Sequence, residues 1–368
     1  MKKILFILTS PNPYGAEISI LTNITYLSKI KKISPIFIIR SKGKLEEFLK
    51  KKGYEFYISP FFFWVSKKKN YFKSIIKLFF NLILSIQFYF KLRKKKINYV
   101  YTNTFTTHFG LILSLFLKSK HIFHIRELAE KQFGLTFDFE QKKIFNLSEK
   151  FSFKILTNSN FLLENLKKHF KKKIFLIPNP VDDKFNKKNK MNFKKRLKII
   201  FVGRLMEDQN PFLLIDIFKK YKTKNIQLDV YGEGPLKNEL AEKIKKEKIG
   251  NIIKLKDYKD KIYNILKNYS IGLSLAKHQT FNRTIVEYMK SGILVLANNS
   301  GNNPFLIDNN KNGFLIKKNN SRLYQDKILM FYKNKKMLRK FSHSAYKKFK
   351  NKFTVKDSSM KLYRVINE

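Results

Sequence analysis

The stretch from residue 273 to residue 316 restricts the possible folds more than any other part of the chain. It contains a short apolar run that ends at Leu275, a polar loop, an amphipathic segment over residues 284–290 and a second apolar run over residues 293–297. Gly292 lies between the amphipathic segment and the second run, where it would end a helix. Short apolar runs that alternate with a helical pattern are typical of a parallel sheet covered by helices. We therefore predict an α/β fold.

Two polar loops in this stretch, residues 278–283 and 298–303, are candidates for a ligand site. In an open α/β sheet, ligands bind outside the carboxyl ends of the strands, where both loops would lie. The helix that begins near Asn282 would direct its free N–H groups and positive dipole end toward this place, which suits an anion such as a diphosphate. Glu287, in the second helical turn, would face the same place. The pattern alone fits a solvated helix carboxylate equally well.

The same alternation of apolar runs and helical segments occupies most of the remaining chain. The turn-rich loop Ser10–Ala16 follows the first run and precedes a helix expected over residues 17–28, which is how a doubly wound sheet begins. With 368 residues, the chain is long enough for two such domains. The other strands are expected at residues 3–9, 35–40, 54–59, 98–102, 121–124, 153–157, 174–177, 197–202, 227–231 and 252–255.

The segment from Gln279 to Met289 resembles the donor-binding signature of glycosyltransferase family 4, whose members are retaining enzymes of the GT-B fold. Glu287 matches the second Glu of that signature, and Gln279, with seven residues in between, stands at the first. The signature continues here through Gly292 to Pro304.

Other motifs extend the resemblance over nearly the whole chain. Gly203-Arg204-Leu205 is similar to the family loop in which an Arg and a Lys neutralise the donor diphosphate, and Gln209 stands at the Lys position. The segments Gly232–Pro235, Tyr14–Glu17 and Pro178–Asp182 also resemble family motifs.

The resemblance implies the GT-B fold, with two Rossmann-like doubly wound domains that face each other across a cleft. It implies an acceptor-side domain over residues 1–182, a polar linker over residues 183–196 and a donor-binding domain over residues 197–350. Residues 351–368 would form a C-terminal helix that crosses back to the first domain.

The resemblance also implies roles for particular residues of this chain. A His at the end of a first-domain strand lines the sugar pocket in the family, and His124 matches it, although a lone His is as often structural. The implied catalytic residues are His124, Glu287 and Gln279. The implied donor-binding residues are Gly15, Gly203, Arg204, Gln209, Gly232, Tyr258, Phe281, Asn282, Arg283, Thr284 and Glu287.

The chemistry implied is transfer of a sugar from a nucleoside-diphosphate sugar, with retention of the anomeric configuration. Arg204 and the helix start near Asn282 would stabilise charge on the leaving diphosphate. Glu287 would accept hydrogen bonds from the donor ribose, and Gln279 would contact sugar hydroxyls. The sequence contains no Asp-x-Asp motif, so we expect no metal ion and no other cofactor. The expected acceptor is a cell-surface glycan or a lipid-linked precursor, as in the biosynthesis of lipopolysaccharide or capsule.

The net charge of +50 has two explanations. One is an anionic partner, and the other is a compositional bias toward Lys, Asn, Ile, Phe and Tyr, which agrees with the spread of Lys along the whole chain. The sequence lacks a basic stripe with interleaved aromatic residues, so we expect no nucleic-acid partner. Spread positive charge draws a protein toward an anionic membrane surface. The absence of Cys fits a reducing cytoplasm. We therefore expect a cytoplasmic protein, peripheral on the inner face of the plasma membrane.

The segment from Phe61 to Lys96 is unusual in composition. Its uncharged part, Leu78–Phe90, is flanked by the basic runs 67–69 and 93–96. Such a helix fits packing on the first sheet with basic ends, or a membrane interface, and both hold if one face contacts the sheet and the other contacts lipid. No uncharged apolar run reaches the length of a membrane-spanning helix, so none is expected, and the short run at the N-terminus is expected to be a strand rather than a signal peptide.

A second hypothesis is a degenerate relative that binds a nucleotide or a glycan without turnover. Five departures from the family pattern favour it. They are Gln209, Gln279, Asn282, Asn302 and Phe305.

Overall fold

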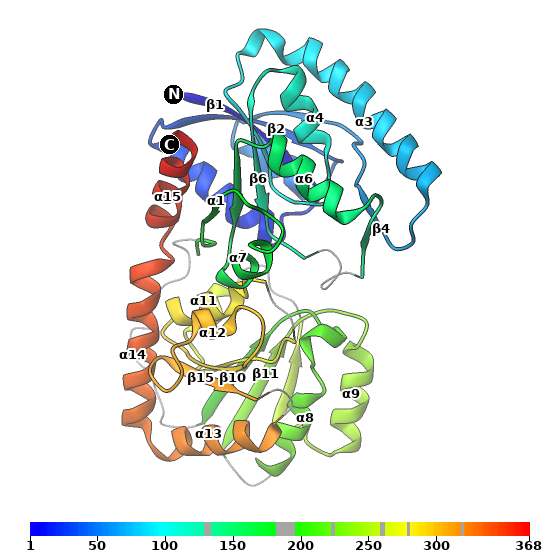
Figure 1. The fold of residues 1–368 in the computed structure, drawn as a ribbon. Helices are drawn as coiled ribbons and strands as arrows, with labels where there is room; N and C mark the ends of the chain where they lie inside the picture. Colours follow the sequence, from blue (N-terminus) through cyan, green and yellow to red (C-terminus); the bar gives the residue numbers. More distant parts are fainter. Residues whose placement is uncertain (129–133, 182–195, 222–224, 258–261, 278–279, 318–319) are drawn as a thin grey trace. The chain divides into compact units, whose positions relative to one another are not determined.

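The computed structural model describes residues 1–128, 134–181, 196–221, 225–257, 262–277, 280–317 and 320–368. The chain forms two compact units. Unit 1 contains residues 1–180 and 355–368, and unit 2 contains residues 181–354. The linker expected at residues 183–196 lies almost wholly outside the described residues. Each unit has its own sheet and its own core (Figure 1).

Unit 1 is built on a seven-stranded sheet in which all neighbouring strands are parallel. The strand order is β3-β2-β1-β5-β6-β8-β9. The strands are β1 (Lys2–Leu8), β2 (Ile33–Ile39), β3 (Glu55–Ile58), β5 (Tyr99–Thr102), β6 (Lys120–Ile125), β8 (Lys154–Thr157) and β9 (Ile174–Leu176). A separate antiparallel pair joins β4 (Val65–Ser66) to β7 (Thr136–Phe137).

Helices pack against this sheet, as Figure 1 shows. They are α1 (Gly15–Lys29), α2 (Lys44–Lys51), α3 (Tyr71–Leu92), which the short 3₁₀ helix η1 (Arg93–Lys95) extends, α4 (Phe109–Phe116), α6 (Gln141–Phe151), α7 (Asn160–Leu166) and α15 (Val355–Asn367). Both faces of the sheet are buried, since Ile4 and Phe6 of β1 belong to one apolar cluster and Leu5 and Ile7 to another. This burial on both faces explains the continuous apolar run at the N-terminus.

The last helix, α15, belongs to unit 1 although it follows unit 2 in the sequence. It packs on α1, where Leu362 and Ile366 join the same apolar cluster as Ile20. The Ser359 hydroxyl donates a hydrogen bond of 3.0 Å to Asn23 Oδ1 in the same buried contact. The two segments of unit 1 therefore share one core.

Unit 2 contains a six-stranded parallel sheet with the order β12-β11-β10-β13-β14-β15. Its strands are β10 (Leu197–Val202), β11 (Ile226–Tyr231), β12 (Ile253–Lys256), β13 (Ile271–Ser274), β14 (Leu294–Asn298) and β15 (Gly313–Ile316). Its helices are η2 (Glu207–Gln209), α8 (Leu213–Phe218), η3 (Lys219–Tyr221), α9 (Lys237–Lys246), α10 (Tyr263–Leu266), α11 (Arg283–Lys290), α12 (Asn303–Leu306), α13 (Ser321–Lys333) and α14 (Lys335–Lys352). The α/β fold class predicted from the sequence is confirmed.

Helix α3 corrects the expectation that no segment of the chain is long and apolar enough to span a membrane. The helical stretch Tyr71–Lys95 is long and apolar enough to cross a membrane, by length and composition alone. The sequence prediction required a run without any charge, whereas this helix contains Lys73, Lys77 and Lys91 among its apolar residues. Only 22% of its most apolar window is buried within the protein.

Candidate functional site

The sheet of unit 2 has a topological switch point between β10 and β13. From β10 the chain continues outward to β11 and β12 on one side, and from β13 to β14 and β15 on the other. The loops that follow β10 and β13 meet at the carboxyl edge of the sheet, where the Lys277 N–H donates a hydrogen bond of 2.8 Å to the Asp208 carbonyl. In doubly wound sheets this is the place where ligands bind.

Glycines hold the loops after β10 and β11 in backbone contact. The Leu205 N–H donates to the Glu233 carbonyl at 2.9 Å. A Cβ atom on Gly232 would lie 1.9 Å from the Gly203 carbonyl oxygen, and one on Gly234 would lie 2.4 Å from the Leu205 oxygen. Gly234 also has a φ of +156°, which L residues rarely adopt. The two glycine motifs of the sequence therefore shape this edge of the sheet through close packing.

Arg204 and Gln209 lie in the loop after β10. The Arg204 side chain is exposed and forms no ion pair within the described part of the chain, so it is available to an anion. The Gln209 amide instead donates a hydrogen bond of 2.8 Å to Asp208 Oδ2. Lys277, whose backbone is bonded to Asp208, places a second cation in this group of loops, and the sequence analysis did not single it out.

Helix α11 begins after Asn282, which has a left-handed backbone with a φ of +62°. Its side-chain amide donates to Ser274 Oγ and to Asn303 Oδ1, each at 2.8 Å. Asn is one of the few residues with a side chain that tolerate this conformation. The Asn therefore keeps the backbone geometry that a Gly would give, and its amide adds two contacts that Gly lacks.

A further set of amides joins the loops after β13 and β14. Asn302 donates to the Phe281 carbonyl at 3.1 Å, and Asn303 donates to the Asn298 carbonyl at 2.9 Å. The Phe281 ring is buried in the core, 6.3 Å from the ring centre of Phe353. The backbone carbonyl of Phe281 accepts a hydrogen bond in these loops, but its ring packs in the core. The predicted contact of this ring with the sugar donor is therefore not supported.

Glu287 is paired within α11. Its Oε1 accepts a hydrogen bond of 2.7 Å from Nε of Arg283, one turn earlier, and the two side chains are only 12% and 16% exposed. Burial raises the pKa of Glu287, and the charge of Arg283 opposes this rise. The alternative of a solvated carboxylate is therefore wrong. Thr284, also predicted as a donor contact, is half-buried in the first turn of the helix. Tyr258 and Gln279 lie outside the described residues.

Unit 1 places His124 near the end of β6, with its side chain almost completely buried. Its Nδ1 contacts the Tyr101 hydroxyl and accepts a hydrogen bond of 3.2 Å from the Arg126 guanidinium. Burial lowers the pKa of His124 well below its usual value, and the nearby Arg126 lowers it further. The neutral ring therefore carries its proton on Nε2. This buried N–H has no partner among the described residues.

Arg126 is the centre of a buried network that the sequence analysis did not identify. Its Nε donates to Asn103 Oδ1 at 2.6 Å, and its Nη1 donates to Asn179 Oδ1 at 2.7 Å. The network joins the end of β6 to the loop after β5 and to the segment after β9. A signal was present in the sequence, because Arg126 and Glu127 directly follow a buried strand and a charge in that position needs partners.

Glu17 lies in the first turn of α1 and is only 5% exposed. Burial raises its pKa to about 7, although its hydrogen bonds to backbone N–H groups and the positive charge of Arg126 act in the opposite direction. Gly15 begins the same helix, and a Cβ atom there would meet nothing within 4 Å, so its surroundings leave space for a ligand. The sequence analysis named Gly15 but not Glu17.

Within the described residues, no group of three or more His, Asp or Glu side chains could hold a metal ion. The polar groups described above at the two sheet edges are cations, amides, backbone N–H groups and carboxylates. Such groups bind a polar or anionic organic ligand by hydrogen bonds and charge.

Comparison with known proteins gives a family match for part of the chain and a fold for the whole of it. Residues 182–348 match the family model described as glycosyl transferases group 1. The chain is 26% identical over 227 residues to the UDP-N-acetylglucosamine–peptide N-acetylglucosaminyltransferase GtfA subunit of Streptococcus agalactiae, which covers 58% of this chain and 44% of that protein. It is also 24% identical over 169 residues to the poly(ribitol-phosphate) alpha-N-acetylglucosaminyltransferase of Staphylococcus aureus. This match covers 45% of this chain and 34% of that protein. The chain thus spans less than half the length of these curated relatives.

Solved structures resemble the whole chain. A glycosyltransferase from Rickettsia africae has a TM-score of 0.83 at 20% identity and covers 100% of this chain and 99% of that one. HepE of Anabaena, in complex with UDP and glucose, has a TM-score of 0.79 at 16% identity and covers 100% of both chains. The chain therefore has the GT-B fold of two Rossmann-like domains, and this prediction is confirmed.

Proposed function

We propose that this chain, which carries the group 1 glycosyl transferase region over residues 182–348, moves a sugar from a nucleoside-diphosphate sugar to an acceptor. The observation that carries the proposal is the edge of the unit 2 sheet, where Arg204, the start of α11 and Glu287 lie around the switch point. An exposed Arg and the N-terminus of a helix suit a diphosphate, and a buried carboxylate suits ribose hydroxyls.

In the proposed reaction, Arg204 and the first N–H groups of α11 stabilise the charge that develops on the leaving diphosphate. Glu287, held in position by Arg283, accepts hydrogen bonds from the ribose. The Nε2–H of His124, which has no partner in the described part of the chain, donates to a sugar hydroxyl, and Gln279 contacts another. Transfer proceeds with retention, and the leaving diphosphate guides attack from the same face. The residues that carry this step require no metal ion.

We propose a glycan or lipid-linked acceptor of the cell envelope, and a cytoplasmic location on the inner face of the plasma membrane. The basic composition supports an anionic surface as a partner. The name of HepE's complex includes UDP and glucose, and both curated relatives are N-acetylglucosaminyltransferases by name, so UDP-glucose and UDP-N-acetylglucosamine are the first donors to test.

A degenerate binding protein is the second candidate, and one observation favours it. Gln209 stands at the position of a phosphate-binding Lys and is bonded to Asp208, so it supplies no positive charge. Asn282 and Asn302 do not favour this candidate, because their amides stabilise the loops in which they lie. Release of the nucleoside diphosphate by the unaltered protein, in the presence of a glycan acceptor, would separate the two candidates.

The test begins with a thermal-shift panel of UDP, GDP, ADP and their common sugars. A ligand that binds only the folded state raises the melting temperature in proportion to its saturation. Arg204→Ala should weaken the binding of the identified nucleotide sugar about 10- to 100-fold, because a charged hydrogen bond is lost. Arg322→Ala, which removes an equally exposed Arg on α13, is the matched control and should leave binding unchanged. No shift with any nucleotide sugar would refute the proposed function.

A further inference from the structure

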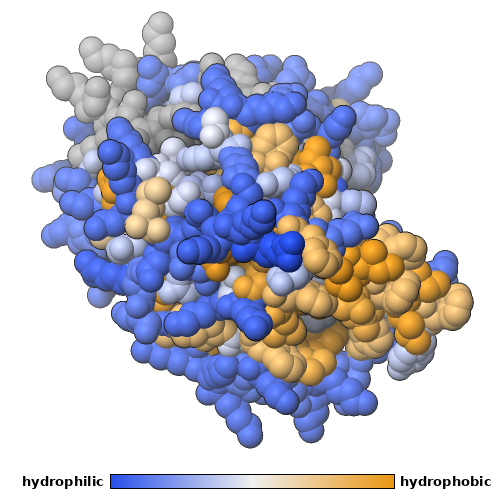
Figure 2. Space-filling view, turned by 90° about the horizontal axis from the view of Figure 1, so that it is seen from above, coloured by the Kyte–Doolittle hydropathy of each residue, from blue (hydrophilic) through white to orange (hydrophobic). Residues whose placement is uncertain are grey.

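Helix α3 faces solvent with its apolar side. Phe72, Ile75 and Phe79 are 75%, 58% and 59% exposed, whereas Asn81 and Ser85 are completely buried. An ordinary surface helix has the opposite arrangement, with apolar residues inside and polar residues outside. Figure 2 shows an extended apolar patch on the face of unit 1 that carries this helix. A surface of this kind fits an environment other than water.

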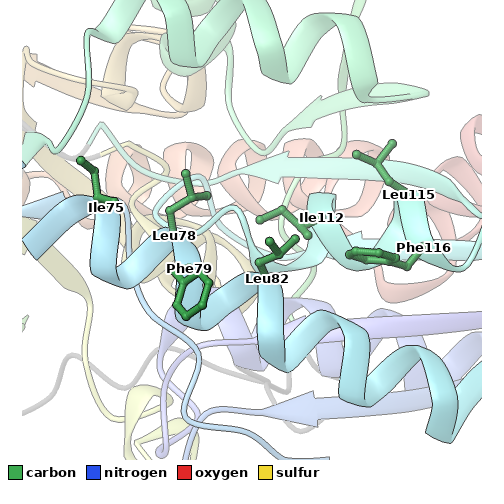
Figure 3. A pocket seen from close by; sticks show the side chains of 7 residues that line it. All are labelled: Ile75, Leu78, Phe79, Leu82, Ile112, Leu115 and Phe116. Atoms are coloured by element: carbon green, nitrogen blue, oxygen red, sulfur yellow. The ribbon is translucent and has the colours of Figure 1, made fainter.

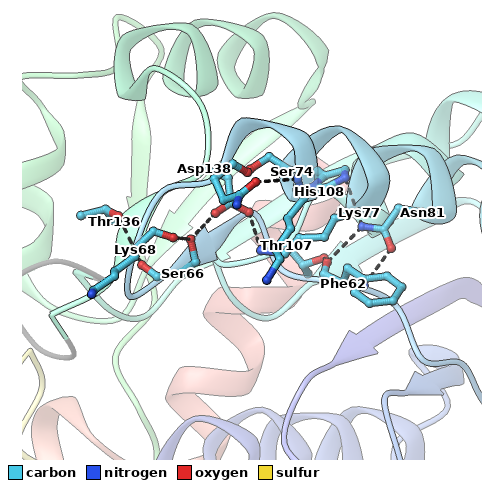
Figure 4. A network of polar contacts seen from close by, with 12 residues as sticks. Phe62, Ser66, Lys68, Ser74, Lys77, Asn81, Thr107, His108, Thr136 and Asp138 are labelled. Carbon is cyan, nitrogen blue, oxygen red and sulfur yellow. Dashed lines mark hydrogen bonds and ion pairs between the residues drawn. The ribbon is translucent and has the colours of Figure 1, made fainter.

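Polar contacts fix the rotation of α3 on unit 1 (Figure 4). The Asn81 amide donates to the Phe62 carbonyl at 3.0 Å and accepts from the Phe62 N–H at 2.8 Å, and it contacts His108 Nε2 at 3.1 Å. Lys77 Nζ pairs with Asp138 Oδ2 at 2.7 Å. Turning the apolar side inward would break all of these contacts. The outward position of the apolar side is therefore part of the folded state.

The exposed side of α3 forms an open groove with α4, as Figure 3 shows. The groove has a volume of about 650 Å³, within the range of small-molecule sites. Its lining residues are all apolar, so the groove itself offers a ligand no side-chain hydrogen bond. They are Ile75, Leu78, Phe79, Leu82, Ile112, Leu115 and Phe116. Hydrocarbon suits this groove, whereas a sugar or a nucleotide does not.

Positive charge is concentrated along α3 and at its two ends. Residues 67–96 contain ten Lys and Arg and no Asp or Glu. Lys77 and Lys95 have carboxylate partners at Asp138 and Glu55, and the other eight have none in the described part of the chain. Basic side chains next to an apolar helix face are typical of helices that lie in the interface of an anionic membrane.

We infer that the α3–α4 face docks on an anionic lipid bilayer, with α3 lying along the interface and one acyl chain of a bilayer lipid in the groove. This inference deepens the membrane location included in the proposed function and rests on that part of it. A second copy of the chain is a poorer occupant. A two-fold interface would place the same basic face against itself, and like charges in contact oppose association.

The experiment uses the full chain and vesicles of phosphatidylglycerol mixed with phosphatidylcholine, sedimented at physiological salt. The double variant Ile75→Ser/Phe79→Ser should bind at least about tenfold more weakly, because it removes apolar area that enters the interface. Both residues are more than half exposed, so the melting temperature should be unchanged. Leu147→Ser, at a 50% exposed position on α6, is the matched control and should bind like the natural protein.

A tryptophan reporter tests the groove itself. Trp64 is the only Trp of the chain and is buried, so Phe79→Trp adds one exposed reporter. Lipids that carry bromine on the acyl chain should quench this reporter strongly and should leave the signal of Trp64 unchanged.

Three results would overturn the inference. They are equal binding to pure phosphatidylcholine vesicles, binding unaffected by the double variant, and a lipid-free dimer that the double variant disperses. The last result would assign the face to a second copy of the chain. Binding of the nucleotide sugar to the double variant is measured separately, so failure of the membrane inference and failure of the proposed transferase activity are distinguishable.

Discussion

Helices α3 and α14 are both long and basic, and they bury opposite kinds of residue. Helix α14 buries Leu338, Phe341 and Phe349 and exposes most of its Lys side chains. Helix α3 buries Ser74, Asn81 and Ser85 over much of its length and Phe88 and Leu92 near its end, and it exposes most of its Phe and Ile side chains. Helix α3 belongs to unit 1 and α14 to unit 2. The apolar side chains of α14 therefore belong to the core of unit 2, whereas most apolar side chains of α3 lie at the surface of unit 1.

The contrast also shows what the sequence can reveal. In α14 the apolar residues recur at helical spacing, so the buried side is evident. In α3 apolar residues occur on nearly every side. Over the first four turns the buried side is marked only by small or polar residues with hydrogen-bond partners, and Phe88 and Leu92 are buried near its end. Of the four predictions that follow, the first two test this comparison and the last two extend it to buried polar groups elsewhere, beginning with the largest expected effect.

Truncating an apolar side chain should have very different consequences in the two helices. Phe341→Ala should lower the free energy of unfolding by about 3–5 kcal/mol, because its buried ring packs on Phe314 and Phe331 and a cavity would remain. Phe79→Ala should change it by no more than about 0.5 kcal/mol, because the ring is mostly exposed. Urea denaturation measures both. Equal losses would mean that α3 is an ordinary core helix.

Removing the buried amide of α3 should be nearly as costly. Asn81→Leu leaves the Phe62 N–H without its partner and removes one of the two donors to the Phe62 carbonyl, at an expected cost of about 3 kcal/mol. Gln87→Leu, which removes an exposed amide from the same helix, is the control, with an expected change within about 0.5 kcal/mol. An Asn81→Leu protein as stable as the natural one would show that the polar contacts do not fix α3.

The third prediction concerns how the free energy of unfolding depends on pH through Glu17, a buried carboxylate of unit 1. Because burial raises the pKa of Glu17 to about 7, the unfolded chain loses this proton near pH 4.5 while the folded chain still holds it. The free energy of unfolding should therefore fall as the pH rises from about 4.5 to 7, by about 3 kcal/mol in total. Glu17→Gln should remove this part of the pH dependence and stabilise the protein at pH 8. Parallel stability profiles of the two proteins would contradict the raised pKa.

The smallest effect is expected at Asn282, a buried amide of unit 2. Asn282→Gly keeps the left-handed backbone but loses two hydrogen bonds, so the free energy of unfolding should fall by about 1 kcal/mol. Asn282→Ala should cost about 1 kcal/mol more, because Ala adopts this conformation with strain. The two variants are compared by thermal melting. If Ala is tolerated better than Gly, the backbone argument fails.

Much of the fold could be predicted, because strands in a doubly wound sheet are short apolar runs between helical patterns. Strand β10 has the bounds that the pattern predicts, and α11 begins one residue before the expected helix. Some bounds were wrong for local reasons. The helix expected over residues 17–28 spans Gly15–Lys29 instead, because the Ile18 N–H already donates a helical hydrogen bond to the Tyr14 carbonyl.

The candidate site was predictable only in part. The pairing of Arg283 with Glu287 follows from their spacing of one helical turn. The network of Arg126 with Asn103 and Asn179 does not, because it joins segments 23 and 53 residues apart that meet only when the sheet of unit 1 is complete. The outward side of α3 was likewise undecided until its polar contacts were known.

The return of α15 to unit 1 has a consequence for protein synthesis. The core of unit 1 includes Leu362, Val365 and Ile366, so residues 1–180 leave the ribosome without part of their own interior. At typical elongation rates of about 5–20 residues per second, the missing helix follows roughly 10–35 seconds later, after all of unit 2. During this interval the nascent first unit exposes the apolar surface of α1 that α15 later covers, and this surface is a ready target for a chaperone.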